Sequence, residues 1–189
     1  MHAFVIPGAS GFAAVRGFTL IELITVLLIA AILAAVGVPM LSDFVADQRV
    51  RTTASDIAAE FAFARAKALE QSRRVFMERT GVSWNDGWRI YADLNNSGTF
   101  DAGEELKVFN GFPAGNMYVC STVADFADNL VFRPDGRVVR TSAVGANDGL
   151  FIVDTKGDAV LANNKIRGIL FGASGRAAVV RMNGVTPPC

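Results

Sequence analysis

Oxygen-bearing side chains recur at a regular spacing between residues 93 and 104. They follow the pattern D-x-N-x-S-G-x-x-D-x-x-E, in which the possible calcium ligands are Asp93, Asn95, Ser97, Thr99, Asp101 and Glu104. Oxygen ligands at these positions, with a glycine at the tight turn, are the chemistry of an EF-hand calcium loop. An EF-hand loop lies between helices, whereas Arg89–Tyr91 and Leu106–Phe109 have the composition of strands. The sequence therefore favours a polar hairpin turn, with calcium as the alternative and as the one cofactor that the chain suggests.

Arginines in the last third of the chain could bind phosphate groups. Lysine plus arginine equals aspartate plus glutamate overall, at 18 each, but basic residues outnumber acidic ones from Val131 to the C-terminus. The residues that could contact DNA are Arg137, Arg140, Arg176 and Arg181. Such a group would bind the DNA backbone without sequence preference and release it as salt rises. Arginines in strands more often lie on a solvated sheet face, and the interleaved acids weaken the field. DNA binding is therefore an alternative that the sequence does not favour.

The chain has two cysteines, Cys120 and Cys189. Their wide spacing, without a CxxC pattern or a histidine partner, argues against a zinc site. If this part of the chain lies outside the cytoplasm, a disulfide between them would tie the C-terminus to the middle of the fold. We prefer the disulfide, and two unpaired thiols are the alternative.

A single carboxylate lies inside a long apolar run near the N-terminus. From Phe18 to Leu41, roughly 24 residues that would form a helix about 36 Å long, Glu22 is the only charge. A helix of this length can cross a membrane, and a carboxylate inside it costs about 2.5 to 3.5 kcal/mol. Cleavage before Phe18 would create a partner, because the new ammonium group would lie one helical turn from Glu22. A pair between neighbouring subunits would set the register of a helical filament. The alternatives are a pair within one chain and a protonated Glu22.

The plausible processing site precedes the apolar run, at Arg16-Gly17-Phe18. An ordinary secretory signal has a shorter apolar core that ends in small residues at its cleavage site. Arg16 puts positive charge on the cytoplasmic flank, so the rest of the chain is expected outside. Near the far end of the run, Pro39 removes one backbone donor and should loosen the helix. That local freedom could help a subunit pass from the bilayer into a filament.

The groups of the common enzymes are missing from the sequence. The only histidine, His2, lies in the segment that processing at Gly17 would remove, so no Ser-His or Cys-His pair could form. Phosphate-binding motifs such as the P-loop and G-x-G-x-x-G are also absent. We therefore predict a structural or binding protein without catalytic residues.

The elements that would position these residues change type near Ser72. Before it, apolar residues recur at three- and four-residue spacing, which predicts one helix that continues to about Gln71 and packs a stripe on a sheet. The stripe consists of Val50, Ala54, Ile57, Phe61, Ala64 and Ala68. After Ser72, short β-branched and aromatic runs alternate with Gly, Asn and Asp turns. The candidate strands are 74–79, 88–92, 106–109, 130–133, 137–141, 150–153, 168–171 and 177–182, with Pro134-Asp135-Gly136 as a turn.

Several motifs resemble those of a known family. The run Gly17-Phe18-Thr19-Leu20-Ile21-Glu22, with the apolar helix after it, resembles the prepilin peptidase recognition sequence of type IV pilins and type II secretion pseudopilins. Later motifs narrow the resemblance to minor pseudopilins of the GspH/FimT type. They are Ala64-Arg65-Ala66-Lys67-Ala68, the run 87–95 with Gly98 and Gly103-Glu104-Glu105, and Phe132-Arg133-Pro134-Asp135-Gly136-Arg137.

The resemblance implies how the chain is processed and folded. Prepilin peptidase would cut between Gly17 and Phe18, Phe18 would be N-methylated, and Phe18, Glu22 and Pro39 would serve assembly. The implied fold is α+β and type IV pilin-like, with a long N-terminal helix packed on a mostly antiparallel β-sheet head. The expected parts are a leader (1–17), a transmembrane and assembly helix (18–41), an amphipathic helix continuing into the head (42–71) and a periplasmic β-rich head (72–189).

The expected function is that of a minor pseudopilin, a structural subunit near the tip of a type II secretion pseudopilus or a type IV pilus. Its partners would be prepilin peptidase and other major and minor pilins or pseudopilins. The chain would cross the bacterial inner membrane once, with its head in the periplasm. The alternative is a DNA-binding minor pilin of a competence pilus, acting in DNA uptake. Family members that bind DNA carry a closely spaced Gly-Arg-x-Arg motif, from which Gly175-Arg176-Ala177-Ala178 departs.

Overall fold

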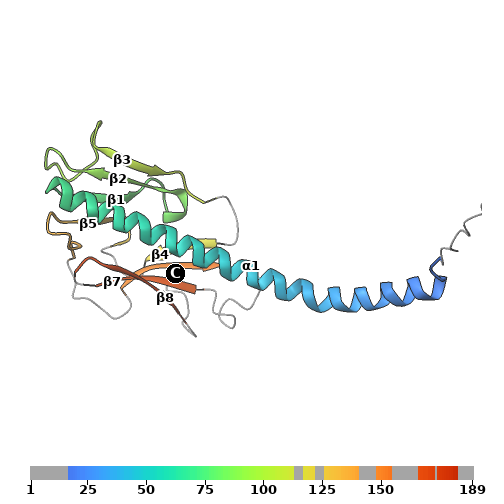
Figure 1. Ribbon diagram of the computed structural model, residues 1–189. Coiled ribbons are helices and arrows are strands. Elements are labelled where there is room, and N and C mark those ends of the chain that lie inside the picture. The colour runs from blue at the N-terminus through green and yellow to red at the C-terminus, as the bar shows by residue number, and fades with distance from the viewer. Residues whose placement is uncertain are drawn as a thin grey trace, which may run out of the picture. The chain divides into compact units, whose positions relative to one another are not determined.

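One helix of 52 residues, α1 (Leu20–Gln71), forms the first part of the chain (Figure 1). The computed structural model describes residues 17–112, 117–121, 126–140, 148–154, 166–172 and 174–182. The prediction of a continuous helix that ends near Gln71 is confirmed. The chain divides into two compact units, residues 1–42 and residues 43–189, and α1 contributes to both.

In the first unit, α1 is apolar and exposed. Every residue from Gly17 to Leu41 is exposed, including all of its large aliphatic side chains. The helix is long and apolar enough to cross a membrane. Pro39 lies inside the helix without ending it, although it removes one backbone donor. An apolar surface of this extent is unfavourable in water, so this segment requires a bilayer or neighbouring helices around it.

In the second unit, α1 buries one stripe of side chains. The stripe consists of Ala46, Val50, Ala54, Ile57, Phe61, Ala64 and Ala68, each no more than 2% exposed. A spacing of three and four residues places these side chains on one helical face. The predicted packing stripe is therefore confirmed, and its alanines let the helix approach the sheets closely. Phe63, beside the stripe, is partly buried against the same core.

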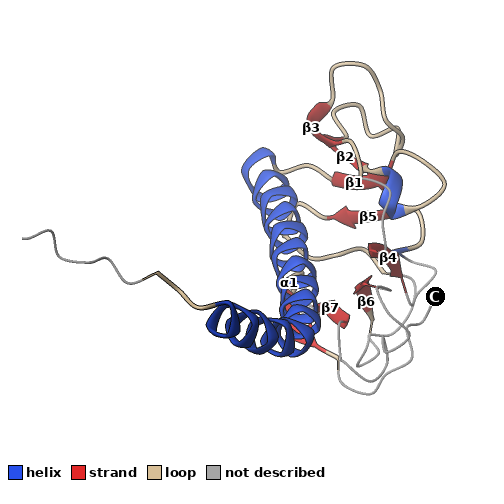
Figure 2. Ribbon diagram, turned by 90° about the vertical axis from the view of Figure 1, so that its right-hand side faces the viewer, coloured by secondary structure: helices blue, strands red, loops and turns tan. Residues whose placement is uncertain are grey.

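Two four-stranded sheets complete the second unit (Figure 2). In spatial order, the first sheet contains β3 (Glu105–Phe109), β2 (Trp88–Ala92), β1 (Val75–Arg79) and β5 (Asn129–Phe132). The second contains β4 (Met117–Ser121), β6 (Gly149–Asp154), β7 (Ile166–Phe171) and β8 (Ala177–Arg181). A short 3-10 helix, η1 (Trp84–Asp86), precedes β2. All strand pairs among the described residues are antiparallel, which confirms the predicted fold class.

The stripe of α1 and both sheets share one hydrophobic core. Phe61 of the helix meets Phe171 of β7 edge to face, with ring centroids 4.8 Å apart. In the first sheet, Trp88 stacks on Phe109 at 4.2 Å. A smaller cluster around Phe151 lies apart from this core and includes residues of β6 and β7. Because successive strand residues point to opposite faces, β6 is buried on both sides.

Two strand assignments differ from the sequence pattern. The pattern does not predict β4, because Met117–Ser121 mixes apolar residues with Cys and Ser. The predicted strand at 137–141 is wrong for residues 137–140, where only Val138 forms a bridge, to Phe132; residue 141 lies outside the described residues. The turn at 134–136 is present, since Gly136 has a φ of 76° and donates its N–H to Arg133 O at 2.8 Å. Beyond it, Val139 donates its N–H to Val131 O at 2.8 Å, but residues 137–140 form no continuous strand.

Candidate functional site

A threonine closes the N-terminal end of α1. Thr19 precedes the first helical residue, and its Oγ1 accepts the backbone N–H of Glu22 at 3.3 Å. This N-cap bond satisfies one of the donors that a helix start leaves unpaired. Thr25 Oγ1 donates to the carbonyl of Glu22 at 2.9 Å. The T-x-x-E spacing from Thr19 to Glu22 is a capping signal from which this cap could have been predicted.

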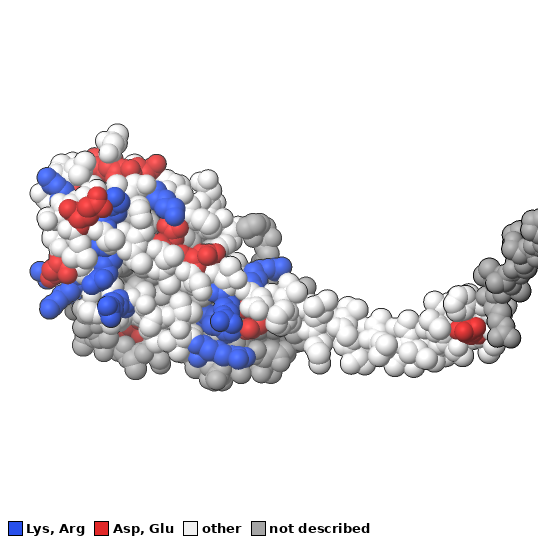
Figure 3. All heavy atoms as spheres, in the orientation of Figure 1, with Lys and Arg blue, Asp and Glu red and all other residues white. Residues whose placement is uncertain are grey.

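The side chain of Glu22, by contrast, is available to a partner. In a complete capping box the carboxylate would bond back to the N-cap N–H. Among the described residues, the Glu22 carboxylate has neither a hydrogen bond nor an ion pair. It shares an open hollow of about 520 Å³ with Gly17, Phe18 and Thr19. Every other residue from Leu20 to Leu41 is uncharged, and this surface is almost wholly white in Figure 3.

Gly17 and Phe18 precede α1 in an exposed, non-helical segment. Phe18 is 85% exposed, and a Cβ added to Gly17 would meet nothing within 4 Å. Packing within this chain therefore does not require glycine at position 17. A requirement for glycine there would come from the enzyme that cuts the bond. Residues 1–16, the rest of the predicted leader, lie outside the described residues.

The acidic loop between β2 and β3 is held by its own donors. Glu104 is 4% exposed and accepts the N–H groups of Leu94 at 2.8 Å and Asp101 at 3.0 Å, one on each carboxylate oxygen. The buried Asp93 accepts a hydrogen bond from Arg74 Nη2 at 2.7 Å through Oδ2, while its Oδ1 has no hydrogen-bond partner. Both ends of the loop considered for calcium are thus engaged with protein groups.

The middle of the loop bonds to itself. Asn95 Nδ2 and Ser97 Oγ both donate to Asp101 Oδ2, at 2.8 and 3.0 Å, and these bonds lower the pKa of Asp101 below its usual range. Thr99 donates its backbone N–H to Ser97 Oγ at 3.2 Å. Across the described part of the chain, no group of three or more acidic, histidine or cysteine side chains is placed to hold a metal. The geometry favours a polar hairpin loop, and calcium remains an untested alternative.

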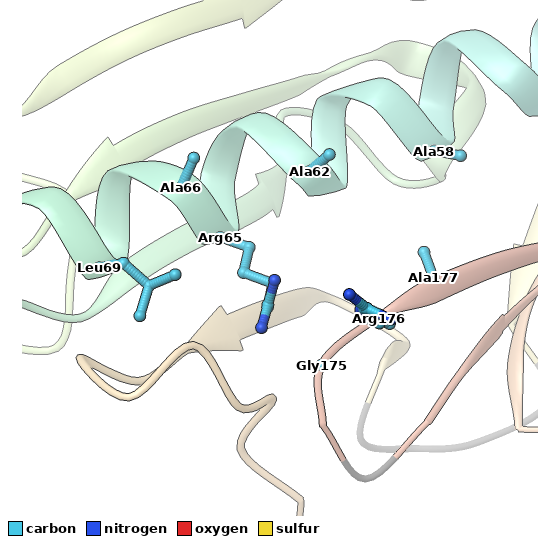
Figure 4. A pocket seen from close by; sticks show the side chains of 8 residues that line it. All are labelled: Ala58, Ala62, Arg65, Ala66, Leu69, Gly175, Arg176 and Ala177. Carbon is cyan, nitrogen blue, oxygen red and sulfur yellow. The ribbon is translucent and has the colours of Figure 1, made fainter.

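The four arginines considered for DNA do not form one surface. Arg140 is 10% exposed, pairs with Asp148 at 3.5 Å and donates to Phe171 O at 3.2 Å. Arg137 and Arg176 are exposed and each lines a hollow beside Arg65 of α1. Figure 4 shows the hollow that Arg65 and Arg176 share.

Arg181 lies in a third place, in a hollow with Arg51 and Arg167. DNA binding by the four residues stays a prediction, and the structure distributes them over separate sites.

Cys120 lies in the middle of β4 and is half-buried. It is a bonded cysteine. Cys189 lies outside the described residues, so the predicted Cys120–Cys189 pairing stays a prediction.

Comparisons with known proteins agree with this architecture. Residues 53–185 match the family model for the type II transport protein GspH, and residues 13–38 match the prokaryotic N-terminal methylation motif. No curated protein sequence matches the chain. A crystal structure of the type IV minor pilin FimU from Pseudomonas aeruginosa, strain PAO1, aligns with a TM-score of 0.51 and 18% identity. That alignment covers 70% of this chain and 89% of FimU. A second crystal form of FimU aligns with a TM-score of 0.48 and 17% identity, over 69% of this chain and 91% of that one.

The long helix, the antiparallel head and the similarity to FimU define a pilin-like fold. Because the GspH model covers more than half of the residues, the chain belongs to the GspH family of type II transport proteins. This is a family of pseudopilins, which are structural subunits, so the predicted non-enzymatic role follows from the family. The methylation motif implies processing by prepilin peptidase, and the family assembles with other pseudopilins.

Proposed function

We propose that this protein is a minor pseudopilin that assembles through its N-terminal helix near the tip of a type II secretion pseudopilus or a related type IV pilus. In this proposal, prepilin peptidase cuts between Gly17 and Phe18, and Phe18 is then N-methylated. The exposed, non-helical position of both residues supports access by the peptidase. Membership in the GspH family and the fold shared with a type IV minor pilin support assembly into a pseudopilus or a type IV pilus.

The observation that carries the proposal is the unpaired carboxylate of Glu22 in the otherwise uncharged, exposed segment from Leu20 to Leu41. Cleavage before Phe18 converts an amide into an ammonium group one helical turn away. A carboxylate in an apolar medium requires such a partner. When helices of neighbouring subunits pack together, the ammonium of one can pair with Glu22 of the next, which fixes their axial register.

Before assembly, the same helix anchors the subunit in the bacterial inner membrane as a single pass. The bilayer and the interior of a helical filament are both apolar, so the exposed surface from Leu20 to Leu41 is compatible with either. Arg16 on the cytoplasmic flank orients the head toward the periplasm. An oxidising periplasm would also allow the predicted bond between Cys120 and Cys189.

The test of processing and position uses the full chain, expressed with its prepilin peptidase and partner subunits. Mass spectrometry of the mature protein should find Phe18 as the first residue, with one added methyl group. An epitope on the head should be labelled at one end of isolated filaments and be rare relative to the main subunit. Labelling along the whole filament would contradict the tip position, and an intact residue 17–18 bond would contradict the processing.

DNA uptake is the competing outcome. Retention of duplex DNA by the full chain in neutral detergent, lost as salt rises, would favour a competence pilin. The ion pair of Arg140 with Asp148 and the separation of Arg181 from Arg137 and Arg176 give that outcome less support.

A further inference from the structure

Two arginines lie directly opposite each other in the second sheet. Arg167 of β7 and Arg181 of β8 are register partners in an antiparallel pair. Partners in such a pair point to the same face of the sheet, and like charges in this arrangement repel. Hydrophobic or oppositely charged residues would stabilise the pair better. The arrangement therefore suggests that an anion offsets the repulsion.

A third arginine joins them from the helix. Arg51 of α1 lines the same hollow, of about 470 Å³, together with Asp47, Ser55 and Val179. Figure 3 shows basic and acidic side chains interspersed over the visible face of the head. The hollow thus brings together three guanidinium groups from three elements of the second unit.

Asp47 balances only one of these charges. Its Oδ1 accepts a hydrogen bond from Arg167 Nη2 at 2.7 Å, and the Arg167 side chain is only 8% exposed. Arg51 and Arg181 are exposed, and neither has an ion-pair partner among the described residues. Among the described residues that line the hollow, one carboxylate faces three arginines, which leaves a net positive charge. A buried, oriented Arg167 beside two available guanidinium groups is suited to an oxyanion with several acceptor oxygens, such as a phosphate.

The position of the hollow along the chain indicates which kind of phosphate-bearing molecule lies near it. Asp47 follows Leu41, the last residue of the apolar run, by six residues. A chain of six residues spans at most about 22 Å. If the apolar run crosses the membrane, Asp47 therefore lies within about 22 Å of the last residue of that run, which is within reach of the bilayer surface. Basic residues at that depth meet anionic lipid headgroups.

We propose that Arg51, Arg167 and Arg181 bind the phosphate of an anionic phospholipid headgroup while the subunit is in the membrane. The inference rests on the proposed membrane anchoring. Val179, which is 40% exposed in the same hollow, provides an apolar wall beside the phosphate. DNA is a poorer fit, because this is one compact hollow, and two of the arginines considered for DNA, Arg137 and Arg176, line other hollows.

The test is a titration of the full chain in neutral detergent micelles. Short-chain phosphatidylglycerol is compared with short-chain phosphatidylcholine, inorganic phosphate and duplex DNA. The readout is the melting midpoint followed by tryptophan fluorescence, since Trp84 and Trp88 are buried in the head and a ligand of the folded state raises the midpoint. The variants are Arg51→Gln and Arg181→Gln. Arg133→Gln, an exposed arginine outside the hollow, is the control with the same change of charge.

Phosphatidylglycerol should raise the midpoint at far lower concentration than phosphatidylcholine or inorganic phosphate. Arg51→Gln and Arg181→Gln should each weaken this binding about fivefold, and Arg133→Gln should leave it unchanged. Equal effects of the two lipids, equal effects of phosphatidylglycerol and free phosphate, tighter binding of DNA, or an equal loss in Arg133→Gln would each overturn the inference. Membrane retention after carbonate extraction is scored separately. Loss of retention would overturn the proposed anchoring, whereas retention without lipid preference would overturn only the headgroup site.

Discussion

Phe61 of α1 and Phe171 of β7 pack edge to face, with ring centroids 4.8 Å apart and an angle of 79° between the rings. Phe61 is 1% exposed, and this contact joins the helix to the second sheet. Phe61→Ala removes the ring and leaves a cavity, so the head should lose about 3 to 5 kcal/mol of unfolding free energy. Denaturant unfolding followed by tryptophan fluorescence measures the loss. Phe63→Ala, two residues along the same helix and only partly buried, is the control and should cost less. An equal loss in both variants would mean that the contact with Phe171 is not what matters.

The loop between β2 and β3 should depend on Glu104 for stability. Its two carboxylate oxygens accept the N–H groups of Leu94 and Asp101. Glu104→Ala leaves both donors without that partner and should cost about 2 kcal/mol of unfolding free energy. Glu105→Ala, at the exposed neighbouring position, should be close to neutral. A similar cost for the two variants would show that the bonds of Glu104 do not hold the loop.

Calcium should have no effect on the stability of the same loop. Asp93 pairs with Arg74, and Asp101 accepts bonds from Asn95 and Ser97, so these carboxylates already have partners within the protein. The melting midpoint of the head should be the same in millimolar calcium and after a chelator. A rise with calcium that Asp101→Asn abolishes would establish the metal site instead.

The stability of the head should fall in alkaline solution because of Tyr91. Tyr91 is 1% exposed and stacks on Phe76 at 5.0 Å. Burial, and then the nearby charge of Glu78, raise the pKa of Tyr91 well above its usual value of about 10. The folded protein thus favours the neutral phenol. The stability that this contributes is fully present below about pH 10 and is lost as the pH rises past the pKa that Tyr91 has in the unfolded chain.

Tyr91→Phe should reduce this alkaline loss, when unfolding free energies at about pH 8 and about pH 11 are compared. Tyr118→Phe keeps Tyr91 and should therefore retain the loss. If Tyr91→Phe lost as much stability as the parent protein, another group would be responsible.

Periodicity predicted much of this fold. The stripe from Val50 to Ala68 could be located because helical spacing reports directly on which face is buried. The turn at 134–136 could also be located, because proline and glycine restrict or permit specific backbone angles. β4 could not be located, because it is a short strand of five residues of mixed polarity. Only its pairing with β6 makes this segment a strand.

Contacts between segments that lie far apart in the chain could not be predicted from the sequence. The sequence pattern places Arg140 on an exposed strand, yet it is partly buried and contacts Asp148 and the carbonyl of Phe171. Arg167 pairs with Asp47, which is 120 residues away in the chain. Which arginines share a site depends on the order of the strands, and no local pattern contains that order. By contrast, Glu22 could be singled out at once, because a charge in an apolar run is costly wherever the chain folds.

The role of Glu22 in assembly is tested most directly by the amount of Glu22→Gln subunit in filaments. The full-length precursor is expressed with its partner subunits, and sheared filaments are compared with the membrane fraction. Gly17→Ala is the reference for failed processing and should remain at precursor size. We predict that Glu22→Gln is cut to the mature size and held in the membrane like the parent. Its content in filaments should fall at least about tenfold, because the pair with the Phe18 ammonium of a neighbour is lost. Incorporation of Glu22→Gln at the level of the parent would show that assembly does not require the carboxylate.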